Sequence, residues 1–257
     1  MKNTITVAIV QSALYWEDID KNLSQFEDMM DKIPKSADLV VFPETFSTGF
    51  TMNVASIGDS SGKTLAWMHR MAEEHKKFIA GSCIIQENGN YHNRLFWATP
   101  EGEVEYYDKR HLFRVGREQE QFTSGDRRVI TDLGPFRILL QICYDLRFPV
   151  FSRNRGDYDA ILYVANWPAV RQHVWDTLLT ARAMENQAYV IGVNRTGVDG
   201  EGVEHTGGSC VIAPTGIIKA RLNHQPGLLV SSLDIQEIRA FRSKFPASED
   251  ADDFQLL

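Results

Sequence analysis

Short apolar segments rich in β-branched residues alternate with amphipathic helical patterns along this chain of 257 residues. Residues 5–11 have the composition of a strand, and the apolar residues of the next stretch, from Ile19 to Ile33, recur every three or four positions, as on one face of a helix. Residues 39–42 are again typical of a strand. This alternation predicts a mixed-sheet α/β fold, in which helices pack on sheets.

The same pattern continues toward the end of the chain. Further strands are expected at residues 78–85, 91–99, 104–108, 137–143, 160–164, 189–194, 209–212, 217–222 and 227–233, and further helices at 65–75, 174–187 and 235–245. Two stretches lack periodicity. We expect residues 109–128 to form a functional loop, because long structureless loops usually have a role, and the glycine-rich residues 197–208 to form a flexible surface loop.

No interior run of Pro, Ser or charged residues marks a domain boundary, so we expect residues 1–257 to form a single domain. Only the acidic tail, residues 248–257, is expected to be mobile, because its carboxylates leave it little apolar surface to bury.

Charge and composition exclude several classes of partner. The formal net charge is −7 and no basic block occurs, which argues against nucleic acid. Charged residues interrupt every apolar stretch before the roughly 18 residues needed to cross a bilayer, so no membrane partner is expected. The amino-terminal apolar run is too short for a secretion signal, and the three cysteines are widely separated. We therefore expect a cytoplasmic protein with neither a disulfide framework nor a structural zinc site.

Three segments place a reactive side chain at the end of an expected strand, where open α/β sheets build their sites. Glu44 follows the second strand, Lys109 ends the fifth and begins the aperiodic loop, and Cys143 ends the strand at 137–143. Each has an ordinary structural alternative: a loop carboxylate that caps a turn, a surface ion pair, or an inert buried thiol. Their combination favours a catalytic site.

The order of these three segments along the chain, and the residues around each reactive side chain, resemble the nitrilase superfamily of carbon–nitrogen hydrolases. The motifs FPE at 42–44, YDK at 107–109 and ICYDLRFP at 142–149 match its Glu, Lys and Cys segments. Gln11, TARAMENQ at 180–187 and PTG at 214–216 also match family positions, so the resemblance spans nearly the full chain. It implies a four-layer α-β-β-α sandwich in which Glu44, Lys109 and Cys143 converge.

The resemblance also implies the chemistry of the site. Cys143 would attack an amide as nucleophile, activated by Glu44 as base and Lys109 as cation, and form a thioester that water hydrolyses. This chemistry would require no metal and no organic cofactor. Lys109 and the backbone N–H of Tyr144 would stabilise the oxyanion, a contribution of about 3 kcal/mol per donor. A second glutamate often lies seven residues before a glycine in the loop after the lysine. That spacing selects Glu118, with Glu120 as the alternative.

Within the family the chain looks most like the bacterial ω-amidases, which act on 2-oxo acid monoamides such as 2-oxoglutaramate. The motif ANWP at 165–168 supports this resemblance most. The carboxylate of such a substrate needs a cation, for which arginine is best suited. We predict Arg171 for this task and Trp167 for the pocket wall, among the candidates Arg114, Arg117, Arg147, Arg171 and Arg195. For Arg147 the sequence favours an ion pair with Asp145 or Asp159 instead.

Several alternatives stay open. The protein could be an amidase or N-carbamoyl hydrolase of the same superfamily with another substrate, or a Cys–His hydrolase that uses His173 or His205. It could also be a non-catalytic assembly subunit of this fold. Because family members commonly pair through helices near the site, we expect a homodimer or a higher homo-oligomer, with a small amide molecule as the other partner.

Overall fold

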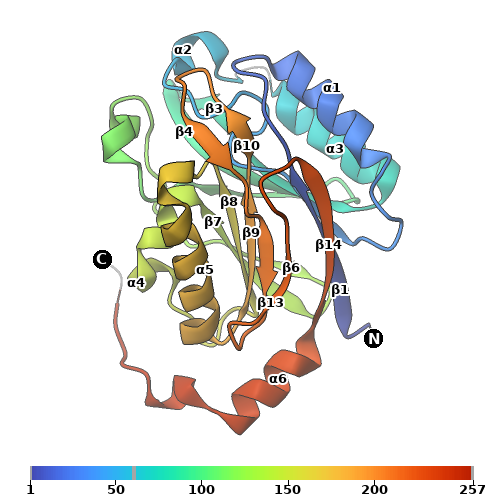
Figure 1. Ribbon diagram of the computed structural model, residues 1–257, viewed down its shortest axis with the longest axis vertical. Coiled ribbons are helices and arrows are strands. Elements are labelled where there is room, and N and C mark those ends of the chain that lie inside the picture. The colour runs from blue at the N-terminus through green and yellow to red at the C-terminus, as the bar shows by residue number, and fades with distance from the viewer. Residues whose placement is uncertain (1, 60–61, 256–257) are drawn as a thin grey trace.

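The structure is a computed structural model that describes residues 2–59 and 62–255. Two six-stranded sheets pack face to face, and helices cover the outer face of each sheet (Figure 1). The expected fold class, a four-layer α-β-β-α sandwich, is therefore confirmed.

The first sheet is parallel at its centre. Its strands, in spatial order, are β14 (Gly227–Asp234), β1 (Thr4–Gln11), β2 (Leu39–Val41), β3 (Phe78–Glu87), β4 (Asn90–Ala98) and β5 (Val104–Asp108). β1, β2 and β3 run in the same direction, and the other three are antiparallel to their neighbours. Glu44 lies three residues after β2, and Lys109 follows β5 directly.

The second sheet repeats this plan. Its strands, in spatial order, are β13 (Ile218–Arg221), β12 (Cys210–Ile212), β9 (Tyr189–Asn194), β8 (Ala160–Ala165), β7 (Phe136–Ile142) and β6 (Ile130–Leu133). β7, β8 and β9 are parallel to one another. Cys143 follows β7 directly, and Asn166 follows β8.

Helices form the outer layers. They are α1 (Ile19–Met30), α2 (Val54–Ile57), α3 (Lys63–His75), α4 (Pro149–Ser152), α5 (Gln172–Asn186) and α6 (Ile235–Lys244). α1 and α3 lie side by side on the first sheet, and α5 covers the second (Figure 1). The Asp18 side chain caps α1 by accepting a hydrogen bond from the Lys21 backbone N–H, at 3.0 Å.

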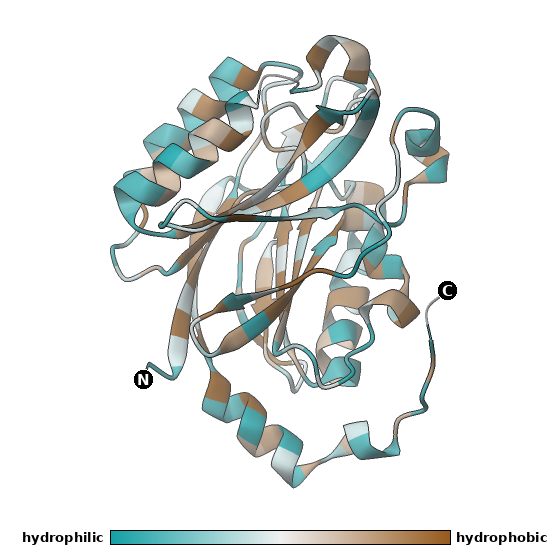
Figure 2. Cartoon of the chain, turned by 180° about the vertical axis from the view of Figure 1, so that it is seen from behind, coloured by the Kyte–Doolittle hydropathy of each residue, from teal (hydrophilic) through white to brown (hydrophobic). Residues whose placement is uncertain are grey.

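The strands are buried on both faces. On β1, Val7 belongs to the apolar layer between the sheets, whereas its neighbour Ala8 packs toward α1 and α3. On β7, Leu140 belongs to the layer between the sheets and Leu139 packs toward α5. Strands covered on both faces are nearly continuous apolar runs. Figure 2 shows this contrast between the mostly hydrophobic strands and the mixed polar surfaces of the outer helices.

The element boundaries differ from expectation at a few points. α1 ends at Met30, three residues before Ile33, because Pro34 disfavours helical backbone in the residue that precedes it. β7 ends at Ile142, so Cys143 lies outside the strand. The short elements β6, α2 and α4 have no clear periodicity, and the sequence does not predict them.

The expectation of a flexible loop at residues 197–208 is wrong. β10 (Thr196–Val198) and β11 (Glu204–Thr206) form an antiparallel hairpin, and His205 within it is 4% exposed. The glycines permit close packing: a Cβ added to Gly200 would lie 2.4 Å from the Trp16 ring, and one added to Gly207 would lie 2.4 Å from the Gln11 side chain.

The acidic tail contains a short 3-10 helix at Ala247–Asp250. The guanidinium of Arg155 lies 4.5 Å from the centroid of the Phe254 ring, and residues 256–257 lie outside the described residues. Mobility of the tail stays a prediction. Among the described residues, no helix combines the length and the apolar character needed to span a bilayer.

Candidate active site

The carboxyl group of Glu44 is held by donors from both sheets, and the residue is 1% exposed. Its Oε1 accepts hydrogen bonds from Lys109 Nζ and from Asn93 Nδ2 on β4, both at 2.8 Å. Its Oε2 accepts one from the backbone N–H of Asn166, at 2.8 Å. This arrangement fixes the orientation of the carboxylate in a site closed to bulk water.

The ammonium group of Lys109 lies between two carboxylates. Its Nζ is 2.8 Å from Glu44 Oε1 and 2.9 Å from Glu118 Oε1, and the residue is 1% exposed. Burial opposes its charge, but the carboxylates of Glu118 and Glu44 outweigh burial and raise the pKa of Lys109. Lys109 therefore remains a cation.

Glu118, rather than Glu120, is the second glutamate of the site. Glu118 lies on a 3-10 helix at Glu118–Glu120 and is fully buried, and its Oε2 accepts the backbone N–H of Phe113 at 2.6 Å. Burial raises the pKa of its carboxyl group. Glu120 is exposed and pairs with Arg117 at 2.6 Å.

Cys143 lies on a sharp turn between β7 and a 3-10 helix at Cys143–Arg147. Its φ of 44° is in the left-handed region, which costs a non-glycine residue about 1–2 kcal/mol. Burial, and after it the negative charge of Glu44, raises the pKa of the thiol. Tyr144 is in the first turn of the 3-10 helix, where backbone N–H groups have no partner within the helix.

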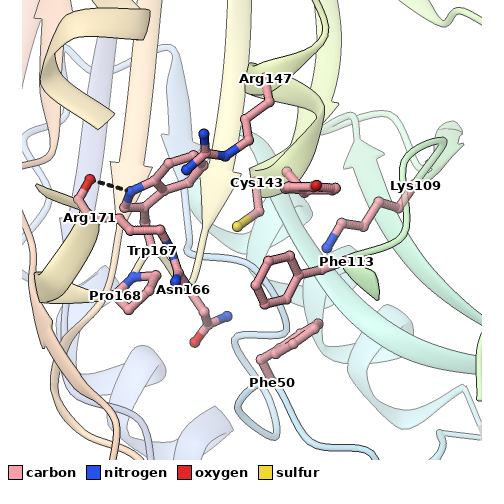
Figure 3. Close-up of a pocket in the computed structure, with 10 residues that line it drawn as sticks. Phe50, Lys109, Phe113, Cys143, Arg147, Asn166, Trp167, Pro168 and Arg171 are labelled. Atoms are coloured by element: carbon pink, nitrogen blue, oxygen red, sulfur yellow. Dashed lines mark hydrogen bonds between the residues drawn. The ribbon is translucent and has the colours of Figure 1, made fainter. Parts of the chain in front are cut away.

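A narrow cavity of about 30 Å³ adjoins these groups. By this measure the space suits roughly two water molecules. Figure 3 shows Cys143 between Lys109 on one side and Trp167 on the other. The cavity is lined by Phe50, Lys109, Phe113, Cys143, Tyr144, Arg147, Asn166, Trp167, Pro168 and Arg171.

Two buried residues, Glu44 and Lys109, lie with the partly buried Cys143 at the strand ends of a four-layer sandwich. This arrangement agrees with the comparison of the chain with known families. The model of the carbon-nitrogen hydrolase family matches residues 6–243. The chain belongs to the carbon-nitrogen hydrolase family. It is accordingly an enzyme that hydrolyses amides.

Relatives of this carbon-nitrogen hydrolase cover nearly its whole length. An omega-amidase of Escherichia coli is 44% identical over 98% of each chain. A 2-oxoglutaramate amidase of Bacillus subtilis is 30% identical and covers 95% of this chain and 96% of its own. A crystal structure of a superfamily protein from Xanthomonas campestris, with an arsenic adduct in its active site, is 38% identical with a TM-score of 0.97, and covers 99% of this chain and 100% of its own.

In this carbon-nitrogen hydrolase, the structure corrects the expected surroundings of one arginine. Arg147 does not pair with Asp145 or Asp159, whose carboxylates instead bind Tyr107 and His111, and Arg137 and Arg242, respectively. Arg147 lines the cavity, and its guanidinium lies 5.3 Å from the centroid of the Trp167 ring.

The other predicted arginines have different surroundings. Arg171 also lines the cavity, with its guanidinium 5.3 Å from the centroid of the Phe113 ring. Arg114 is exposed, Arg117 pairs with Glu120, and Arg195 is fully buried; none of the three lines the cavity.

The Cys–His alternative finds no support in the described residues. His205 lies in the β10–β11 hairpin, 4.0 Å from Asp199, and His173 is exposed in the first turn of α5. Neither histidine lines the cavity beside Cys143. Within residues 2–59 and 62–255, no cluster of His, Cys, Asp and Glu side chains could hold a metal ion.

The sequence analysis does not predict a role for two side chains of the site, Asn93 and Asn166. Asn93 contacts Glu44, and Asn166 contacts both Glu44 and, through Nδ2, Thr45 Oγ1 at 3.1 Å. A signal is available for Asn166, a polar residue that directly follows the apolar and fully buried β8. Asn93 lies between His92 and Arg94 in the polar part of β4, where the sequence offers no such signal.

Proposed function

We propose that this enzyme hydrolyses the terminal amide of 2-oxo acid monoamides, such as 2-oxoglutaramate and 2-oxosuccinamate, to the 2-oxo acid and ammonia. One observation carries the proposal: the cavity beside the Cys143 thiol is also lined by two guanidinium groups, of Arg147 and Arg171, and no carboxylate among the described residues pairs with either. The names of the omega-amidase and 2-oxoglutaramate amidase relatives support the same substrate class.

The first step forms a bond between the Cys143 sulfur and the amide carbon. Because burial and Glu44 raise the pKa of the thiol, Cys143 rests as a neutral thiol rather than the thiolate that the cation alone would favour. Glu44 takes the thiol proton as the sulfur attacks, and the carbonyl oxygen becomes an oxyanion. The positive charge of Lys109 and the N–H of Tyr144 stabilise that oxyanion.

The tetrahedral intermediate then collapses. The carbon–nitrogen bond breaks, Glu44 returns its proton to the departing nitrogen, and ammonia leaves a thioester on Cys143. Water attacks the thioester while Glu44 takes a proton from it, and the acid is released as the carbon–sulfur bond breaks and Glu44 reprotonates the sulfur. Glu118 holds Lys109 in place throughout.

The carboxylate of the substrate is assigned to Arg171, with Trp167 as a wall of the pocket. A guanidinium grips a carboxylate through two parallel hydrogen bonds. Arg147 is a second cation within the same cavity and stacks on the Trp167 ring.

The test is ammonia release from a panel of 2-oxo acid monoamides, glutamine, asparagine, nitriles and N-carbamoyl compounds. We expect the highest kcat/KM for a 2-oxo acid monoamide. A higher value for an N-carbamoyl compound or a nitrile would overturn the proposed substrate, and no release from any amide by the folded protein would favour an assembly subunit.

The carboxylate assignment has its own test. Arg171→Leu is expected to raise KM for a 2-oxo acid monoamide at least tenfold, which corresponds to about 1.4 kcal/mol, and to affect a neutral amide far less. Arg147→Leu is the matched variant within the same cavity. If Arg147→Leu shows the selective loss and Arg171→Leu does not, the carboxylate is held by Arg147 instead.

A further inference from the structure

A second buried carboxylate lies behind the nucleophile. Asp145 is fully buried, and its carboxylate accepts three hydrogen bonds and makes one further close polar contact. Its Oδ2 accepts the Tyr107 hydroxyl at 2.8 Å and the Ile142 backbone N–H at 2.9 Å. Its Oδ1 accepts the His111 backbone N–H at 3.0 Å and contacts His111 Nδ1 at 2.7 Å.

These four contacts bracket two residues of the site. Tyr107 and His111 lie two positions before and two positions after Lys109, and Ile142 directly precedes Cys143. The carboxylate of Asp145 thus joins both flanks of the lysine, at the end of β5, to the turn that carries the thiol, at the end of β7. It is a direct link between the two sheets at the point where their reactive groups meet.

His111 supplies a side-chain contact of this link. Both oxygens of Asp145 already accept N–H or O–H donors, so the close Nδ1 contact is favourable when Nδ1 carries the proton and donates it. The imidazole also stacks on the Phe148 ring, with centroids 3.9 Å apart and an angle of 8° between the planes. The ring is partly exposed and borders a groove of about 670 Å³, outside the cavity that contains Cys143.

We propose that His111 is a positioning residue for amide hydrolysis: by donating from Nδ1 to Asp145, it holds Lys109 and Cys143 at their working separation. The inference rests on the proposed roles of those two residues. His111 does not line the substrate cavity, so its loss acts on the chemical step and leaves substrate binding largely intact. A displacement of about 1 Å between reacting groups can reduce a rate by up to about 100-fold.

Two substitutions separate the donor from the aromatic stack. His111→Asn keeps an N–H donor close to the position of Nδ1 and loses the ring, whereas His111→Phe keeps the ring on Phe148 and loses the donor. We expect His111→Phe to lower kcat about tenfold with KM within about twofold of wild type, because a misplaced nucleophile slows only chemistry. His111→Asn should retain most of the wild-type kcat.

His69→Phe, on α3 and remote from the cavity, is the matched control for replacing a histidine by phenylalanine and should keep the wild-type kcat. If His111→Phe does not fold, Tyr107→Phe carries the same test, because it removes a donor to Asp145 on the other flank of Lys109 and keeps the ring. Its expected effect is again a fall in kcat at nearly constant KM.

The outcomes distinguish this inference from the proposed function. If wild type hydrolyses amides, Cys143→Ala does not, and His111→Phe keeps the wild-type kcat, the positioning role is wrong while the thiol mechanism stands. If His111→Asn loses as much as His111→Phe, the donor is not what matters, and the positioning role is again wrong. If Cys143→Ala is as active as wild type, the proposed mechanism itself fails.

Discussion

At the scale of single residues, two carboxyl groups share one ammonium group in a space closed to water. Lys109 bonds to both Glu44 and Glu118, and Cys143 lines the same cavity as Lys109. The carboxylates keep the lysine charged, and burial together with the charge of Glu44 raises the pKa of the thiol. In the proposed mechanism, the nucleophile is therefore formed only when Glu44 accepts its proton, in the same event as the attack.

Removal of the base should separate thiol ionisation from catalysis. In Glu44→Gln the negative charge that raises the pKa of Cys143 is gone while Lys109 remains, so that pKa falls and the thiolate fraction at pH 8 rises. We expect faster alkylation of Cys143 by iodoacetamide, together with loss of amide hydrolysis by several orders of magnitude. Cys143→Ala gives the background for labelling and should have no turnover. Slower alkylation of Glu44→Gln than of wild type would contradict this account.

The two neighbouring glutamates offer a matched pair. Glu118→Gln removes a buried charge from Lys109 and weakens the contact with the Phe113 backbone, so we expect kcat to fall by at least about tenfold. Glu120→Gln alters only an exposed pair with Arg117 and should leave kcat within about twofold of wild type. Steady-state kinetics on the best amide of the panel measures both, and equal losses would show that charge in this loop, rather than the contact with Lys109, is responsible.

At the scale of elements, the β10–β11 hairpin has a pH dependence that can be measured. Burial lowers the pKa of His205 from 6.5 to about 4, so the folded state excludes a proton that the unfolded chain binds. Stability is therefore complete above pH 6.5 and falls as the pH drops from 6.5 toward 4, by about 3 kcal/mol in all. Urea unfolding between pH 7 and pH 4.5 should show this loss, with a smaller slope in His205→Gln. The exposed His173→Gln is the control, and an unchanged slope in His205→Gln would contradict the assignment.

Elements that are buried on both faces are the part of the fold that the sequence predicts well. β2 is a continuous apolar run, and β7 is apolar except for Arg137 and Gln141. Their ends, and with them Glu44 and Cys143, can therefore be located without coordinates. The surroundings of Arg147 cannot be predicted in this way, because the carboxylate of Asp145 is bound by Tyr107 and His111, which lie 38 and 34 residues away along the chain. Pairings over such distances depend on how the two sheets meet.

The β10–β11 hairpin shows a different limit of structure prediction from sequence. Glycine in a sequence is equally compatible with a flexible loop and with close packing. At Gly200 and Gly207 the choice is made by Trp16 and Gln11, which lie about 200 residues earlier in the chain and against which no side chain would fit. Asn93 likewise cannot be identified as a site residue from the sequence, because nothing in the neighbouring residues distinguishes it from a polar residue at the surface of a strand.

At the scale of the whole molecule, apolar side chains remain exposed on the layer that contains α4 and α5. Val150 and Met184 are each 56% exposed, and Val170 is 80% exposed. We expect this layer to be covered in a homodimer. Light scattering at micromolar concentration should then give twice the chain mass of 29.2 kDa, and Met184→Glu should shift the protein toward the monomer. A wild-type mass equal to that of one chain would contradict the prediction.

The site is divided between the two sheets: Glu44, Lys109 and Glu118 belong to the first half of the chain, and Cys143 and Asn166 to the second. A nascent chain that has reached residue 130 already contains the base and the lysine, but it has nothing for them to activate. Cys143 is synthesised later, and its thiol has the environment of an ordinary cysteine until the two sheets pack together. Under the proposed mechanism, hydrolytic activity therefore requires both sheets to be packed together, and we expect a molecule whose sheets have separated, or a proteolytic half of it, to be inactive.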